Sequence, residues 1–309
     1  MRKAEEISNI DSFEPAQLSP DENEKIAGPA LTSLQHSWRQ LCRNKGAILS
    51  LIAISVLVFL AIVGPYMNDY TYFETDYSAS YQGSSPEHWL GTDKFGRDQW
   101  TRIWQGTRVS LYIAVLAAVL DLIIGVVYGA ISAYAGGKVD NVMQRIIEIL
   151  VGIPNLIIVI MLIMLMKPGI FTITVAMVIT GWVNMARLVR AQIFKLKEQE
   201  YVLAARTLGT SNFRLIAKHM IPNTIGLIII NIMFTIPSAI FTEAFLSFIG
   251  LGLQEPQASL GVLINDGYQS IRNQYHLLLY PAIVIITLMV SFNLLADGLR
   301  DALDPKMRR

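Results

Sequence analysis

The segment EYVLAARTLGTSNFRLIAKHMIPN, Glu200–Asn223, is a polar stretch that separates two long apolar runs of the chain. Its first half consists of good helix formers and ends at Gly209, a residue type favoured just after the end of a helix. Thr210 or Ser211 then caps a second short helix, which we expect to run up to Pro222. The segment is therefore predicted to be two short helices in a polar loop.

The surface of this loop suits contact with a soluble protein. Ala204 and Ala205 are small and would let a bulky partner approach the first helix closely. One side of the loop is apolar, and basic residues keep the loop out of the hydrocarbon. The apolar residues are Leu203, Leu208, Phe213 and Ile216, and the basic ones are Arg206, Arg214 and Lys218. An ordinary amphipathic loop helix is the alternative interpretation.

The composition is typical of a membrane protein. Of the 309 residues, 53% are hydrophobic and only 16% are charged, and the mean hydropathy is +0.43. A net charge of +1 provides no basic surface for nucleic acid. The single cysteine, Cys42, can form no internal disulfide, and the four histidines show no metal-binding spacing. No G-x-x-x-x-G-K phosphate loop occurs, so we expect any ATP hydrolysis on a separate chain. No nucleophile and base pair can be proposed on spacing grounds, so we do not expect this chain to be an enzyme.

Six apolar runs are each long enough to cross a bilayer core of about 30 Å. They cover residues 46–67, 108–133, 146–166, 170–190, 222–249 and 278–299. In lipid, backbone polar groups must be satisfied within their own helix. The predicted fold class is therefore all-α, a polytopic membrane bundle of six transmembrane helices. Gly152, Pro154 and Pro237 interrupt these runs at places where the helices could kink.

The predicted organisation follows from these runs. Residues 1–45 are a cytoplasmic tail, disordered to about residue 30, with an amphipathic piece over 31–43 on the membrane surface. Residues 46–67 form an additional N-terminal span, and residues 68–107 an extracellular loop. Residues 108–300 form a five-helix core that contains the loop 191–221, and 301–309 are a cytoplasmic tail. Lysine and arginine gather in four segments on one side, which the positive-inside rule places in the cytoplasm with both termini.

The central loop resembles the EAA loop of ABC-importer permeases, in which a short cytoplasmic helix docks into a cleft on the ATPase. That motif reads Glu-Ala-Ala, three residues, Gly and a distal Pro. The matching residues here are Ala204, Ala205, Gly209 and Pro222. Leu203 stands where the acidic residue is expected, and Glu200 lies one helical turn earlier. The resemblance implies that Glu200 and the four matching residues couple the chain to an ATPase.

Three more segments are similar to permeases of the dipeptide and oligopeptide ABC family. They are HWLGTDKFGRDQWTRIWQGTRVSLYIA (88–114), TEAFLSFIGLGL (242–253) and GLRDALDPKMRR (298–309). With the central loop, the resemblance extends from about residue 35 to the C-terminus. The chain resembles in particular the C-type membrane subunit of oligopeptide importers, which has one span added ahead of a five-span core.

The resemblance implies a multi-pass permease of the bacterial cell membrane that forms a peptide path with a second, related permease. Two separate ATPase subunits would carry ATP and magnesium, and an extracellular binding protein would deliver the peptide, so this chain would bind no cofactor itself. Dipeptides or a nickel chelate are alternative substrates. A stand-alone secondary transporter and a membrane receptor are further alternatives, although neither an internal repeat nor a proton-relay cluster is visible.

Ionisable residues inside spans are costly and by default indicate function. Asp121 lies in the middle of the second run, and its neighbours one helical turn away are Ala117, Ala118, Gly125 and Ile124. This face is small and is therefore predicted to pack closely against another helix. We predict that Asp121 lines the substrate path, the alternative being an interhelical hydrogen bond or ion pair. The other polar positions predicted to face a water-filled path are Asn231, Thr235 and Asn184. Glu243 and Glu148 are expected near the outer and inner ends of their spans, and Arg102 or Arg108 at the lipid headgroups.

Overall fold

A computed structural model describes residues 33–303 of the chain. The predicted tail over residues 1–30 and the last six residues of the predicted C-terminal tail lie outside the described residues. Helices make up most of the described part, which contains no strand beyond an isolated bridge between Thr92 and Asp98. The all-α fold class is therefore confirmed.

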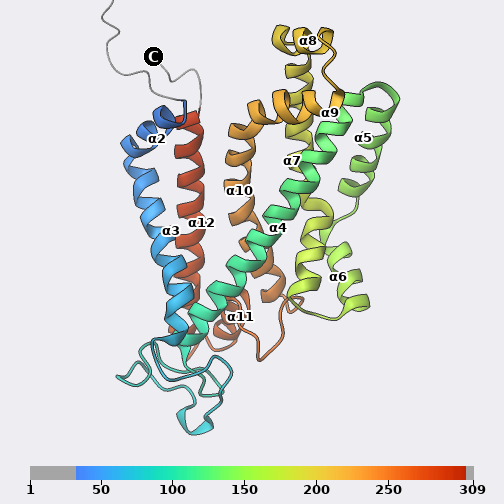
Figure 1. Ribbon diagram of the computed structural model, residues 1–309. Helices are drawn as coiled ribbons and strands as arrows, with labels where there is room; N and C mark the ends of the chain where they lie inside the picture. The colour runs from blue at the N-terminus through green and yellow to red at the C-terminus, as the bar shows by residue number, and fades with distance from the viewer. Residues whose placement is uncertain (1–32, 304–309) are drawn as a thin grey trace, which may run out of the picture.

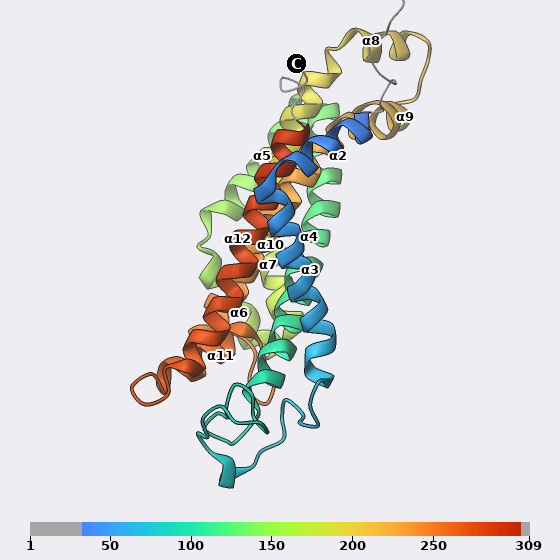
Figure 2. The same cartoon turned by 90° about the vertical axis from the view of Figure 1, so that its left-hand side faces the viewer.

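The helices stand side by side in an elongated bundle (Figures 1 and 2). In chain order they are α2 (Ser33–Arg43), α3 (Lys45–Val63), α4 (Gln99–Ala135), α5 (Gly137–Gly152), α6 (Asn155–Met166), α7 (Ile170–Lys197), α8 (Glu200–Thr207), α9 (Asn212–Arg214), α10 (Ile221–Phe248), α11 (Leu260–Gln269) and α12 (His276–Leu303). Short 3₁₀ turns lie at Gly64–Tyr66 and Tyr77–Ala79, and a π-helical segment at Leu215–Met220 joins α9 to α10. The short helices α8 and α9 lie at one end of the bundle, and α11 lies at the other (Figure 1).

Within residues 33–303, five helices are long and apolar enough to cross a membrane, and a bent pair supplies a sixth crossing if it counts as one span. The bent pair is α5 and α6, which meet at 80°. The predicted run over 146–166 is therefore not one straight helix. Ile153 is extended, as expected for a residue that precedes a proline, and Pro154 then starts a new direction. Pro237, in contrast, stays inside α10.

The second span begins earlier than the hydropathy pattern indicated. Helix α4 starts at Gln99, because the Asp98 side chain accepts a hydrogen bond from the backbone N–H of Thr101 at 2.8 Å and caps the helix. Residues 99–107, predicted as part of the outer loop, are therefore helical. The second outer segment, residues 251–276, also contains a helix, α11, which was not predicted.

Small residues bring the central helices together. The contact between α4 and α7 is the most extensive in the described structure. A β-carbon on Gly125 would lie 2.6 Å from Met185, and one on Gly129 would lie 2.4 Å from the carbonyl oxygen of Ala186. The predicted close packing of this face of the second span is therefore confirmed. On the opposite side of the bundle α3 packs along α12, where Gly298 lies against Ala47 (Figure 1).

The outer end of the bundle is held by buried charges. Arg102 is fully buried and forms an ion pair with Asp266 of α11 at 3.3 Å. Arg97 pairs with Asp93 at 2.6 Å and with Glu255 at 3.4 Å. Of the two arginines considered for the headgroup position, Arg102 is therefore excluded, because its partners come from segments that fold over the start of α4. Arg108 instead donates to the carbonyl oxygens of Ala61 and Ile62 at the end of α3.

Candidate functional site

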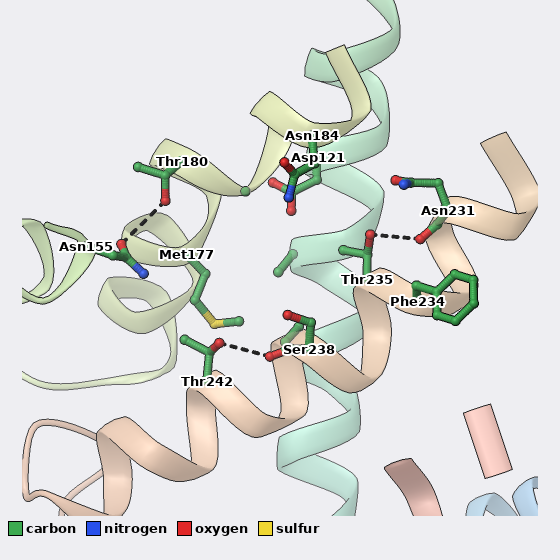
Figure 3. Close-up of a pocket in the computed structure, with 13 residues that line it drawn as sticks. Asp121, Asn155, Met177, Thr180, Asn184, Asn231, Phe234, Thr235, Ser238 and Thr242 are labelled. Atoms are coloured by element: carbon green, nitrogen blue, oxygen red, sulfur yellow. Dashed lines mark hydrogen bonds between the residues drawn. The ribbon is translucent and has the colours of Figure 1, made fainter. Parts of the chain in front are cut away.

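A polar cavity of about 350 Å³ lies inside the bundle between α4, α6, α7 and α10 (Figure 3). Each helix presents one face to it, because residues three or four positions apart lie on the same side of a helix. The lining polar residues are Asp121 on α4, Asn155 on α6, Thr180 and Asn184 on α7, and Asn231, Thr235, Ser238 and Thr242 on α10. Amides and hydroxyls around a single carboxylate can solvate a polar or charged group at membrane depth.

The structure brings together all three residues predicted for the path, Asp121, Asn231 and Thr235, and it adds the predicted Asn184 (Figure 3). The Asn155, Thr180, Ser238 and Thr242 side chains were not predicted. Their signal was present in the sequence only for α10, where Asn231, Thr235, Ser238 and Thr242 repeat at helical spacing. Asn155 is isolated in an apolar run, and only the bend after α5 turns it toward α7, where Thr180 donates to it at 3.4 Å.

Asp121 has no partner of its own in the described structure. Its side chain is only 6% exposed, and its Oδ1 atom accepts no hydrogen bond. The alternative of an interhelical hydrogen bond or ion pair is therefore not found among residues 33–303. Gly181 lies directly against the carboxylate, where a β-carbon would be 2.3 Å from Oδ2.

One side of the cavity is open. Asn155, Asn184 and Ser238 are exposed, although Asn184 and Ser238 lie well inside the membrane-crossing helices α7 and α10 and Asn155 begins α6 at the bend. A second cavity of about 310 Å³ adjoins the first along α7 and shares Asn155, Thr180 and Asn184 with it. It reaches the bend at Pro154 and, one turn further along α7, the exposed Arg187. The two cavities form a continuous polar strip along α7 toward the end of the bundle that carries α8.

Glu243 lies outside this cavity and is completely buried. Its carboxylate accepts hydrogen bonds from the hydroxyls of Ser110 at 2.7 Å and Ser247 at 2.8 Å. Ser110 in turn accepts from the backbone N–H of Leu260 at the start of α11 at 3.2 Å. Glu243 lies near the end of α10, as expected, but it is buried, since the segment 251–260 folds back over the end of that helix. Glu148 is exposed and pairs with Arg145 at 2.6 Å, as an interfacial residue does.

The loop over residues 200–223 contains two helical segments, as predicted, but the second one does not end before Pro222. Helix α8 ends at Thr207, and Gly209 follows with φ +79°, the left-handed conformation expected just after a helix. Ser211 starts α9 but makes no side-chain cap, and α9 continues through the π-helical segment into α10 without a break. The predicted second helix is therefore the beginning of α10. Pro222 does not end it but follows directly after the π-helical segment, in which the Ile221 N–H donates to the carbonyl oxygen of Ile216.

The coupling residues implied by the resemblance fall on different faces of this loop. Glu200 and Ala204 are exposed on α8, and Pro222 is exposed on α10. Ala205 is half-buried against the chain's own cluster around the buried Val202. The loop also exposes Leu208 (86%) and Phe213 (82%) to solvent, which leaves a large unpartnered apolar surface at this end of the bundle.

The loop is tied to the bundle by polar contacts as well. The hydroxyl of Tyr134, at the end of α4, donates to Asn212 of α9 at 2.5 Å, and Lys197 of α7 donates to the Tyr134 carbonyl oxygen at 2.8 Å. Arg190 of α7 holds Asp140 of α5 through two hydrogen bonds of 2.6 Å. These contacts connect the loop to α4, α7 and α10, three of the helices that line the cavity.

A bundle of membrane-crossing helices with a polar cavity inside it and an exposed helical loop at one end defines a membrane transport subunit. The chain belongs to the family of binding-protein-dependent transport system inner membrane components, whose model matches residues 125–309. A second model, the N-terminal TM domain of oligopeptide transport permease C, matches residues 32–83. The chain is accordingly a multi-pass membrane permease and a transport subunit of an ABC system.

Curated relatives match over nearly the whole length. The chain is 46% identical over 289 residues to the dipeptide transport system permease protein DppC of Bacillus subtilis, which covers 93% of this chain and 90% of that protein. It is also 46% identical over 297 residues to the oligopeptide transport system permease protein OppC of the same organism, covering 96% and 97%. The oligopeptide transport system permease protein OppC of Escherichia coli K12 is 38% identical over 290 residues, covering 93% and 95%.

Proposed function

We propose that the chain is one of two permease subunits of an ATP-driven importer for oligopeptides. The observation that carries this proposal is the polar cavity, which supplies amides, hydroxyls and one carboxylate inside an apolar bundle. Peptide backbones are strings of hydrogen-bond donors and acceptors that need such groups when they leave water. The names of the relatives, which are dipeptide and oligopeptide permeases, favour peptides over the alternative of a nickel chelate.

The second permease is needed to close the path. Exposed amide and hydroxyl side chains at Asn155, Asn184 and Ser238 would be costly against lipid. A related chain that places its own polar strip opposite α6, α7 and α10 would cover them and leave water and substrate between the two subunits. A cavity of about 350 Å³ also lies near the lower end of the range for small-ligand sites, about 300–1,000 Å³, so one chain provides only part of a peptide path.

Energy would come from partner ATPases. The sequence holds no phosphate loop, so we place ATP and magnesium on two separate ATPase subunits and no cofactor on this chain. Helix α8 would dock into a cleft on an ATPase by the helix-in-groove mode. Exposed Glu200 and Ala204, with the apolar Leu208 and Phe213, would form the contact, while Ala205, Gly209 and Pro222 would shape the loop.

The continuity of α9 with α10 suggests how the motion reaches the substrate. Helix α10 carries Asn231 and Thr235 in the cavity, and the same uninterrupted helix begins in the loop at Asn212. Closure of the ATPases would move the loop and thereby tilt one wall of the cavity against α4 and α7. Such a shift between two access states is what alternating access requires.

We place the subunit in the bacterial cell membrane with the loop and both termini in the cytoplasm, as the distribution of lysine and arginine predicts. The opposite end, with α11 and the loop over residues 67–98, would then receive an extracellular peptide-binding protein. Helices α8 and α9 lie at one end of the bundle and α11 lies at the other, which is consistent with this arrangement (Figure 1).

The test is reconstitution of the chain in vesicles with a second permease, ATPases and binding protein. We expect ATP-dependent peptide uptake by the full set and no ATP hydrolysis by the chain alone. Uptake by the chain alone, driven by an ion gradient, would indicate a secondary transporter. Ligand binding without uptake would indicate a receptor, and uptake of nickel chelate but not peptide would change the substrate.

A further inference from the structure

The unpartnered carboxylate of Asp121 is unusual among the acidic residues of the bundle. Glu243 accepts hydrogen bonds from two serine hydroxyls, and Asp140 accepts two from Arg190. Asp121 is buried to a similar extent, yet among residues 33–303 nothing donates to its Oδ1 atom. Burial of a carboxylate without a donor is costly, so its retention needs a counterpart that is absent from the isolated chain.

The surroundings of Asp121 define the chemistry of that counterpart. No lysine or arginine lines the cavity, and Arg187 lines only the adjoining one. The neighbouring polar groups are neutral amides and hydroxyls, and Thr235 already donates to the carbonyl oxygen of Asn231 at 2.9 Å. Gly181 forms the wall beside the carboxylate, and its missing side chain gives the carboxylate itself the room that it occupies. The site is thus a single carboxyl group in a neutral polar chamber.

We propose that Asp121 binds a primary ammonium group of the transported substrate. The proposal rests on the proposed function, in which this cavity is part of the path. An ammonium group has three donors, which match the carboxylate and the neighbouring amide oxygens, and the charge-assisted bonds would compensate the burial of Asp121. The group is either the amino terminus of the peptide or a lysine side chain, two sources with the same chemistry.

A first experiment measures the charge preference of the cavity without relying on transport. Ser238→Cys in a Cys42→Ser background places an exposed thiol on the cavity wall of the assembled transporter. It is modified with two thiol reagents, aminoethyl methanethiosulfonate, which carries a primary ammonium, and its anionic sulfonatoethyl counterpart. The rates are followed by the mass of this chain. We expect Asp121→Asn to lower the ratio of cationic to anionic rates about tenfold.

A matched control removes a carboxylate outside the cavity. Glu148→Gln is suitable because Glu148 is exposed and already paired with Arg145. It should leave the ratio of rates unchanged. An equal ratio in Asp121→Asn and the parent, or an equal fall with Glu148→Gln, would overturn the proposal.

A second experiment identifies the source of the ammonium group by uptake in vesicles that hold the complete transporter. Three peptides of equal length are compared, chosen because the isolated binding protein loads all three. One has a free amino terminus and no lysine, one is acetylated and contains lysine, and one is acetylated without lysine. We expect the parent to transport the first faster than the third, and Asp121→Asn to reduce that preference about tenfold.

The outcomes separate the two proposals. Rapid uptake of the acetylated lysine peptide would show that any primary ammonium serves, and slow uptake would assign the site to the amino terminus. A preference that Asp121→Asn leaves intact would contradict the role of Asp121. Failure of the parent to transport any of the three would instead contradict the proposed function, while the thiol experiment would still decide the charge preference of the cavity.

Discussion

Gly181 of α7 lies against the carboxylate of Asp121 on α4, so closely that a β-carbon at position 181 would fall 2.3 Å from Oδ2 and 2.7 Å from Oδ1. The two residues belong to different runs of the sequence, and neither predicts the other. Their contact lets a charged side chain lie between two helices that are otherwise packed through small residues. Several expected effects of substitutions depend on contacts of this kind.

Gly181→Ala should displace the Asp121 side chain and reduce transport steeply. The added methyl group overlaps both carboxylate oxygens, and overpacking of this kind costs about 1–3 kcal/mol. Gly226→Ala is the matched control, since it adds the same group inside α10, where Leu303 is the nearest neighbour at an ordinary contact distance of 3.8 Å. Uptake and thermal stability are measured for both variants in the assembled transporter. Equal uptake by Gly181→Ala and the parent would show that the position of the carboxylate is unimportant.

The loop should transmit the ATPase's motion without touching the substrate. Gly209→Val forces a residue with a β-carbon into a left-handed conformation, at a cost of about 1–2 kcal/mol. Ala204→Arg adds bulk on the exposed face of α8, whereas Ala205→Arg would also disturb the packing around Val202. All three should leave membrane insertion intact but lower uptake and weaken ATPase association. Wild-type uptake with normal expression in Gly209→Val and Ala204→Arg would contradict the coupling role.

The orientation prediction is checked with single cysteines at two exposed positions. Ser84 lies in the loop at one end of the bundle, and Ser211 begins α9 at the other end. In a Cys42→Ser background, a membrane-impermeant thiol reagent should label position 84 in intact cells and position 211 only after lysis. Labelling of position 211 from outside would reverse the proposed orientation.

Glu243 should stabilise the fold of the segment that returns over the outer end of α10. Glu243→Ala leaves the hydroxyls of Ser110 and Ser247 without their acceptor, and each buried unsatisfied group costs about 1–3 kcal/mol. Glu243→Gln keeps an acceptor oxygen and should lose less. Thermal unfolding in detergent compares the two variants. If Gln and Ala are equally damaging, the negative charge, rather than the hydrogen bonds, is what matters.

Arg102 should hold the outer loops on the bundle. Arg102→Met removes the fully buried cation that pairs with Asp266, while Lys94 at 3.5 Å and Arg97 at 3.8 Å remain as partners of that carboxylate. We therefore expect a loss at the lower end of the range of about 3–5 kcal/mol for a broken buried ion pair. Arg145→Met removes an exposed arginine of a surface pair, which is worth about 0–1 kcal/mol. Limited proteolysis should cut residues 67–98 faster in Arg102→Met only. Equal protection in the two variants would show that other contacts hold these loops.

Hydropathy and local sequence determined the all-α membrane bundle, the approximate spans and the turn at Gly209. These features depend on near neighbours in the chain: an apolar run must bury its backbone in a helix, and a helix end must find a left-handed residue. The same local rules missed where α4 begins, since Asp98 caps it inside a polar stretch. They also failed to predict that the second helix of the loop continues into α10, because no residue between Ser211 and Pro222 ends the helix.

The tertiary structure alone decided which polar residues meet. Asp121, Asn184 and Asn231 lie on three helices, and only the packing of α4 against α7 and α10 brings them to one cavity. The same holds for Glu243 and Arg102, which are buried because segments distant in the chain fold over them. The sequence shows which residues can carry a charge. Whether such a residue has a partner depends on how distant helices and loops pack around it.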